Sequence, residues 1–210
     1  MISIERIKVY GWESAIHGMR NPMNSWDKSD SHSVNKEGSC WDGCFYIGPN
    51  DFKLMKQLVK AGTDHSKFMR MINITCDIIA PLYWWKEFDT YKVGTVRNSC
   101  STMHKIHAKE FIKSDFSFEQ IPNDVDNCNY VIEKLNFARE KYLETKDKKY
   151  WYAMIQLLPS SYNQRSTVAM NYAVLRNIYH SRKSHRLDEW RTFCEYIEKL
   201  PYSELIMEEI

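Results

Sequence analysis

The sequence predicts one domain over residues 1–210 in the α/β or α+β class, with helices packed on a sheet. Short apolar runs rich in β-branched residues alternate with longer segments at helical spacing. The 210 residues are 43% apolar and 14% aromatic, which suffices for a core and argues against disorder. No repeat, low-complexity tract or Pro/Ser-rich linker divides the chain.

The elements expected in the first third are a strand over 2–10, a short helix over 12–19, a long loop over 20–49 and a helix through 61. Pro22 prevents a smooth continuation of the first helix. The loop lacks periodicity, and a loop of that length is more often functional than not. Asn50 or Asp51 is expected to cap the second helix, and Gly62 to close it.

The remaining elements are a strand over 71–79, a helix over 82–89, a loop over 91–107, helices over 128–145 and 150–158, a strand over 164–170, and closing helices over 171–181 and 187–200. The first of these strands ends at Ala80-Pro81. Segment 82–89 is ambiguous between strand and helix, and helix is favoured because proline suits a first helical position. Segment 91–107 has neither period, and its polar composition suits either a ligand-lining loop or a plain solvated one.

Charge and composition limit the classes of function. Twenty-nine basic and 27 acidic side chains give a formal net charge of +2, so no strong nucleic-acid signal is present. No segment reaches the roughly 18 apolar residues that span a bilayer, so no membrane association is expected. The N-terminus lacks a signal-peptide pattern, and the chain is expected to stay in the cytoplasm.

Six cysteines are spread along the chain, and only Cys40 and Cys44 are close in sequence. Free thiols are the expected state in a reducing compartment. No second Cys/His pair has zinc-like spacing, so no metal site is expected.

Three polar segments carry residue types that bind anions. They are 20–27 with Arg20 and Ser25, 86–105 with Lys92 and Arg97, and 162–186 with Arg165, Asn171 and Arg182. Arginine grips phosphate or carboxylate through two parallel hydrogen bonds, and hydroxyls and amides add neutral ones. Each segment also has a structural alternative, as a proline-pinned turn, a solvated loop or a set of helix-capping cations.

Several common catalytic motifs are missing. The sequence has no GxGxxG, P-loop, HExxH or GxSxG pattern, and nothing in it indicates a covalent nucleophile. A cofactor-dependent reaction or plain ligand binding both stay open.

Taken in order, these segments resemble the flavin-dependent thymidylate synthases, the ThyX family. The matching features are a helix over 51–62, a turn with His65, a strand ending in Ala80-Pro81, an aromatic helix over 82–89, Leu158-Pro159, Arg165 on a strand, Asn171 opening a helix and Arg182 eleven residues later. The resemblance covers roughly residues 51–105 and 150–200, more than half of the chain. It implies a ThyX-like fold with a central mixed or antiparallel sheet.

The family's signature loop, Arg-His-Arg-x-x-Ser-x-Asn-Glu-x-Ser-x-Arg-Tyr, is altered in this chain. Thr90-Tyr91-Lys92 stands in place of Arg-His-Arg, and Thr95 in place of the first serine. Arg97-Asn98 replaces Asn-Glu, Cys100 replaces the second serine, and Thr102-Met103 replaces Arg-Tyr. Lys92 and Arg97 keep positive charge in the loop, so the chain resembles a divergent relative.

The resemblance implies an enzyme that acts on a pyrimidine deoxynucleotide such as dUMP, by C5 methylation or a related one-carbon transfer. FAD would carry hydride, NADPH would be the reductant and methylenetetrahydrofolate the one-carbon donor, in a homotetramer. Arg182 matches the catalytic arginine that favours negative charge on the pyrimidine.

The resemblance also assigns binding roles. Substrate binding is expected of Arg165, Arg97 and Lys92. Arg20 and Ser25 are added to this group because of their residue types. Cofactor binding is expected of His65, Tyr91, Thr95, Asn98 and Asn171.

Two alternatives remain. The altered signature favours a catalytically inactive nucleotide-binding or interaction protein that keeps the fold. A DNA- or RNA-binding protein is the third possibility, which the near-neutral charge disfavours.

Overall fold

The computed structural model describes residues 2–34 and 45–209, so the Cys40/Cys44 pair lies outside the described residues. The chain divides into two compact units. Unit 1 comprises Met1–Ser3, Ile78–Thr90 and Asn98–Ser166, and unit 2 comprises Ile4–Asp77, Tyr91–Arg97 and Thr167–Ile210. The single domain expected over 1–210 stays a prediction.

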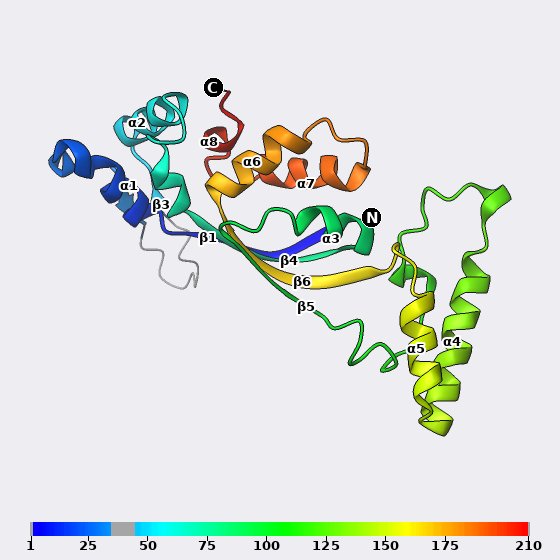
Figure 1. The fold of residues 1–210 in the computed structure, drawn as a ribbon. Coiled ribbons are helices and arrows are strands. Elements are labelled where there is room, and N and C mark those ends of the chain that lie inside the picture. The colour runs from blue at the N-terminus through cyan, green and yellow to red at the C-terminus, as the bar shows by residue number, and fades with distance from the viewer. Residues whose placement is uncertain (1, 35–44, 210) are drawn as a thin grey trace. The chain divides into compact units, whose positions relative to one another are not determined.

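The described strands are β1 (Ser3–Tyr10), β2 (His32–Ser33), β3 (Phe45–Tyr46), β4 (Asn73–Pro81), β5 (Thr95–Ser99) and β6 (Asn163–Asn171). Four of them form an antiparallel sheet in the order β1-β4-β6-β5, and β2 pairs with β3 (Figure 1). The strands expected over 2–10, 71–79 and 164–170 are thereby confirmed, as is the mixed α/β class.

Segment 91–107, expected to be a loop, contains strand β5. The missing periodicity has a physical reason. β5 is the last strand in the order, and most of its side chains are at least partly exposed, so no alternation of buried and exposed residues was required. Its pairing with β6 extends into the next residue, since the Cys100 amide donates to the Arg165 carbonyl at 2.9 Å.

The described α-helices are α1 (Trp12–Arg20), α2 (Pro49–Lys60), α3 (Leu82–Phe88), α4 (Cys128–Thr145), α5 (Lys148–Leu157), α6 (Tyr172–Arg182), α7 (Asp188–Glu198) and α8 (Glu204–Met207). Short 3-10 turns lie at η1 (Asn21–Met23), η2 (Trp26–Lys28), η3 (Lys67–Arg70), η4 (Lys113–Asp115) and η5 (Asn123–Val125). The helices expected from the sequence are all present, with small shifts at their ends. Helix α8 was not expected, and at four residues it is too short to show a period.

The start of α2 differs from the expectation. Gly48 is the N-cap and Pro49 the first helical residue, in place of a cap by Asn50 or Asp51. The cap comes from elsewhere in the chain, because the Asp30 carboxylate accepts the amides of Asn50 and Asp51 at 2.9 and 3.1 Å.

The core of unit 1 lies around the helix pair α4 and α5, which pack against each other (Figure 1). Leu135 and Ala138 are buried three residues apart on one face of α4, and Met154 of α5 is buried with them. Phe111 and Phe116, from the segment that precedes α4, join the same cluster.

The core of unit 2 lies between strands and the C-terminal helices. Ile74 of β4 and Met170 of β6 line the same small apolar space as Leu175 of α6 and Phe193 of α7. Trp190 of α7 is fully buried. Helix α6 contacts both α7 and α8 (Figure 1). This packing holds the last turn of α6 and the first turn of α7 in place, where Arg182 and Trp190 lie.

Candidate functional site

Unit 1 contains a cleft of about 340 Å³, which lies in the lower part of the range of about 300–1,000 Å³ found for small-molecule sites. Its walls come from the start of β6, the segment after β5 and the η4 region. The lining residues are Ile79, Cys100, Ser101, Thr102, Lys109, Ser114, Asp115, Tyr162, Asn163, Gln164 and Arg165. Arg165, expected from the sequence to bind substrate, therefore lies on this cleft.

Gln164 joins two walls of the cleft. Its side chain is buried, and its amide nitrogen donates to the Cys100 carbonyl at 2.7 Å. The Gln164 carbonyl in turn accepts the indole N–H of Trp85 at 3.0 Å. Because consecutive strand residues point to opposite faces, Arg165 points away from Gln164, and its side chain is exposed.

The charges of the cleft are mixed. Lys109 forms an ion pair with Asp115, whose carboxylate also accepts the Ile112 amide at 3.1 Å. The Asp115 charge offsets that of Lys109, and Arg165 is the other cation of the lining. A single guanidinium among hydroxyls suits a phosphate or carboxylate group.

Tyr162 forms a partly buried wall of the cleft. Its ring contacts Phe116 edge-on, with the centroids 5.6 Å apart. Burial raises the pKa of the Tyr162 phenol, and the charges of Asp115 and Cys100 act in the same direction. The phenol is therefore neutral at physiological pH and presents a hydrogen-bonding group.

A second cluster, in unit 2, surrounds Arg182 at the C-terminal end of α6. Its Nε donates to the Tyr91 hydroxyl at 2.9 Å. Its guanidinium carbon lies 4.7 Å from the ring centroid of Trp190 and 5.7 Å from that of Tyr91. A cation at a helix C-terminus is favoured by the helix dipole, and aromatic faces stabilise it further.

Asn171 lies at the opposite end of α6 as its N-cap. Its side-chain oxygen accepts the Val174 amide at 3.0 Å. Gly94 approaches it closely, with φ at +77°, and a Cβ there would lie 2.8 Å from the Asn171 amide nitrogen. Two of the cofactor-binding residues expected from the sequence therefore lie at α6: Asn171 is its N-cap, and Tyr91 contacts its last residue, Arg182.

The other expected residues lie on β5, in the segment before it and in the turn after α2. Thr95 is on β5, and its hydroxyl is a buried atom with no hydrogen-bond partner among the described residues. Arg97 is half-buried on the same strand, whereas Lys92 and Asn98 are exposed. His65 is exposed in the turn after α2, where its amide donates to the Gly62 carbonyl at 3.2 Å. Arg165 belongs to unit 1 and Arg97 and Arg182 to unit 2, so their convergence on one ligand stays a prediction.

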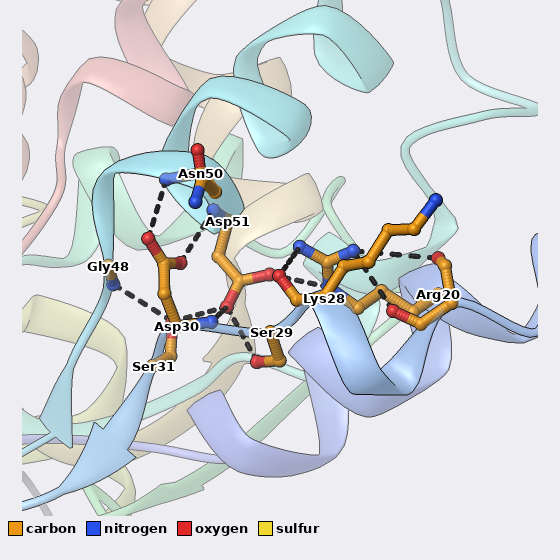
Figure 2. Close-up of polar contacts among 9 residues, drawn as sticks. Arg20, Lys28, Ser29, Asp30, Ser31, Gly48, Asn50 and Asp51 are labelled. Carbon is orange, nitrogen blue, oxygen red and sulfur yellow. Dashed lines mark hydrogen bonds and ion pairs between the residues drawn. The ribbon is translucent and has the colours of Figure 1, made fainter.

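Arg20, expected to contact substrate, is engaged inside unit 2. Its side chain is 6% exposed, and Nε donates to the Asp51 carboxylate at 2.7 Å. The two terminal nitrogens donate to the Ser25 carbonyl at 3.2 Å and the Lys28 carbonyl at 3.0 Å. Figure 2 shows the guanidinium directed at Asp51 and Lys28. These contacts give Arg20 and Ser25 a structural role, and the substrate-binding role expected from their residue types stays a prediction.

Asp51 is the centre of this network (Figure 2). It accepts the hydroxyls of Ser29 and Ser31 at 2.7 and 2.6 Å and the Asp30 amide at 3.1 Å. Burial opposes ionisation of Asp51, but the hydrogen bonds from Ser31, Ser29 and Arg20 outweigh it and lower its pKa. The described part of loop 20–49 is therefore tied to the start of α2.

Three residues of the two clusters are not expected from the sequence: Lys109, Asp115 and Trp190. Lys109 and Asp115 lie in a stretch without a recognisable motif, and no pattern could have pointed to them. The sequence predicts Trp190 as part of a closing helix, but its contact with Arg182 depends on how α7 packs against α6. A tryptophan eight residues after a candidate catalytic arginine was the available hint.

Other features bear on the remaining expectations. Within the described residues, Cys76, Cys100, Cys128 and Cys194 are free thiols. No cluster of three or more His, Cys, Asp or Glu side chains suited to a metal ion occurs in residues 2–34 and 45–209. None of the helices described is both long and apolar enough to cross a membrane.

Comparison with known proteins identifies the fold. Neither a protein-family model nor a curated protein matches the chain. Two crystal structures of the flavin-dependent thymidylate synthase ThyX from Helicobacter pylori, both with FAD and dUMP, do match. One aligns with a TM-score of 0.68 at 18% identity, covering 99% of this chain and 98% of that one. The other has a TM-score of 0.67 at 17% identity, covering 100% and 98%. This chain therefore has the fold of the flavin-dependent thymidylate synthases along essentially its whole length.

Proposed function

We propose that the protein is a divergent flavin-dependent thymidylate synthase-like enzyme that acts on a pyrimidine deoxynucleotide. The observation that carries the proposal is the full-length likeness to two crystal structures of one enzyme with FAD and dUMP, in a chain whose unit 1 cleft has Arg165 on its wall. In the proposed reaction the C5 proton of the nucleotide is replaced by a one-carbon unit from methylenetetrahydrofolate. Two electrons from NADPH complete the methyl group.

The residues present suit phosphate-bearing ligands. The unit 1 cleft is lined by Arg165 together with Ser101 and Ser114. In unit 2, the buried Thr95 hydroxyl has no partner among the described residues, at a position that the resemblance assigns to flavin. Bound FAD would supply the hydride relay between NADPH and the transferred carbon.

The chain's own residues have distinct proposed roles. Arg165 holds the phosphate of the nucleotide, because a guanidinium matches phosphate oxygens with two parallel hydrogen bonds. Arg182 favours negative charge on the pyrimidine and so makes C5 more nucleophilic, an effect worth about 3–4 kcal/mol for a well-placed donor. The family resemblance assigns further contacts to Lys92, Arg97 and Asn98, which we keep as proposals.

The test is direct. Purified protein is examined for flavin absorbance, before and after incubation with FAD, and then titrated with dUMP. Turnover is followed as NADPH oxidation that depends on both dUMP and methylenetetrahydrofolate. The proposal predicts a yellow protein, dUMP binding and dUMP-dependent oxidation. A colourless protein that does not take up FAD would rule out the flavin mechanism.

The altered signature supports a second candidate, a nucleotide-binding protein without redox chemistry. Tyr91, which stands where the signature has histidine, is bonded to Arg182. Binding of dUMP without flavin uptake or turnover would favour this candidate over the first.

Assembly and location are the remaining proposals. The resemblance implies a homotetramer, which light scattering on the purified protein would test by its mass. A cytoplasmic location likewise stays a prediction, and fractionation of the source cells would check it.

A further inference from the structure

The segment Tyr91–Arg97 contacts both ends of helix α6 within unit 2. At the N-terminal end Gly94 lies against the Asn171 side chain, so closely that no Cβ would fit. At the C-terminal end the Tyr91 hydroxyl accepts the Nε–H of Arg182 at 2.9 Å. The segment is therefore placed by α6 and in turn contacts the last residue of that helix.

Two aromatic rings hold the Arg182 guanidinium. Its central carbon lies 4.7 Å from the Trp190 ring centroid and 5.7 Å from that of Tyr91. The two rings contact each other edge-on, at 6.0 Å and an interplanar angle of 67°. Trp190 is fully buried and so cannot reorient without repacking the unit 2 core.

These contacts restrict a side chain that is otherwise flexible. Aromatic rings packed against a guanidinium limit its movement, and a hydrogen bond at Nε limits its rotation further. A preorganised cation stabilises developing negative charge better than a mobile one, because no reorganisation is needed during the reaction.

We propose that Tyr91 and Trp190 are positioning residues that orient the Arg182 guanidinium toward the pyrimidine ring of the bound nucleotide. This inference rests on the proposed function and deepens it. It also gives a role to the tyrosine that stands where the family signature has histidine, because the phenol oxygen of Tyr91 accepts the Nε–H of Arg182.

Tyr91→Phe tests the proposal with the smallest change, because it keeps the ring and removes only the acceptor. Tyr179→Phe is the matched control. Tyr179 lies on α6, the helix that carries Arg182, and its hydroxyl donates to the Glu198 carboxylate at 2.9 Å. The substitution removes this hydrogen bond without changing a contact of Arg182. Trp190→Phe is the second variant, which keeps an aromatic side chain in the buried position.

Three measurements follow. The first is the Arg182 Nε–H resonance in nitrogen-15 NMR spectra, assigned with Arg182→Lys. The second is the change in kcat and, separately, the change in KM for dUMP. The third is the change in kcat and in KM that Tyr91→Phe causes in the Arg182→Lys background. We expect Tyr91→Phe to broaden the resonance and to lower kcat about tenfold, with KM within about twofold, as for loss of one charge-assisted hydrogen bond in the transition state. Tyr179→Phe should change neither, and in Arg182→Lys the Tyr91→Phe effect should shrink to less than about twofold.

The outcomes separate the two proposals. If the wild-type protein turns over and Tyr91→Phe matches it in resonance and kcat, the positioning role is wrong and the proposed function stands. Equal effects of Tyr91→Phe with and without Arg182 also reject the role. If the wild-type protein has no turnover, the proposed function fails. The positioning role is then decided by the resonance, and an unchanged signal in Tyr91→Phe overturns it.

Discussion

The buried ion pair of Arg20 and Asp51 gives the sharpest stability prediction. Asp51 is fully buried and accepts four hydrogen bonds from described residues, one of them from the Arg20 guanidinium. Asp51→Ala removes all four and leaves a buried guanidinium without its counter-charge. Breaking a buried pair by deleting one partner costs about 3–5 kcal/mol, because the remaining charge is desolvated without compensation.

Urea unfolding followed by circular dichroism measures this loss, with Glu144→Ala as the matched control. Glu144 forms an exposed i,i+3 ion pair with Lys141 on α4, and exposed pairs of this kind contribute little to stability. We expect a free energy of unfolding lower by about 3–5 kcal/mol for Asp51→Ala and nearly unchanged for Glu144→Ala. A loss below about 1 kcal/mol in Asp51→Ala would refute the reasoning from burial.

The lowered pKa of Asp51 adds a pH dependence to this prediction. A carboxyl whose pKa is lower in the folded state stabilises the protein at pH values above its unfolded-state pKa, which is ordinarily 3.8. This stabilisation is lost as the pH falls through the folded-state pKa. Asp51→Asn cannot titrate there. The difference in unfolding free energy between wild type and Asp51→Asn should therefore shrink as the pH falls below 3.8. A constant difference would contradict the assignment.

Four further predictions concern the two clusters. Arg165→Ala should weaken dUMP binding by about 2–3 kcal/mol in calorimetry, and an unaltered dissociation constant would count against its place in the site. Arg182→Ala should abolish turnover while the circular dichroism spectrum stays unchanged; retained activity would reject its catalytic role. Gly94→Ala should lower the melting temperature, because its φ of +77° and the contact at 2.8 Å both oppose a Cβ. Exposed Cys100 should react with a thiol reagent faster than buried Cys76, whose pKa burial raises to about 12, and dUMP should slow the Cys100 reaction, as peptide mass spectrometry can follow.

Much of the secondary structure was predictable from local patterns. The bounds expected for the helix over 128–145 agree with those of α4 at both ends. An apolar face repeated over five turns is specific to the helical period. The strand ending at Ala80-Pro81 was recognisable from its β-branched run. Strand β5 was not, since an edge strand with mostly exposed side chains needs no such pattern.

The roles assigned to the candidate site residues stay predictions, and the structure shows only where these residues lie. Arginines at matching spacing pointed to Arg165 and Arg182, and the structure places the first on a cleft and the second against two aromatic rings. Arg20 has the same residue type, but Asp51, 31 positions away, engages it. Residue type alone cannot separate an arginine that meets a ligand from one that meets a buried carboxylate.

The sequence by itself determined the seven longer described helices, the strands β1, β4 and β6 and which residues carry charge, because these depend on properties of neighbouring residues along the chain. The tertiary structure alone decided which of those charges are used internally. Tyr91 and Arg182 are 91 positions apart, and Lys109 and Asp115 join Arg165 on one cleft across about 50 residues. Contacts of that range depend on how whole elements pack, and packing is set by the shape of the core rather than by any local pattern.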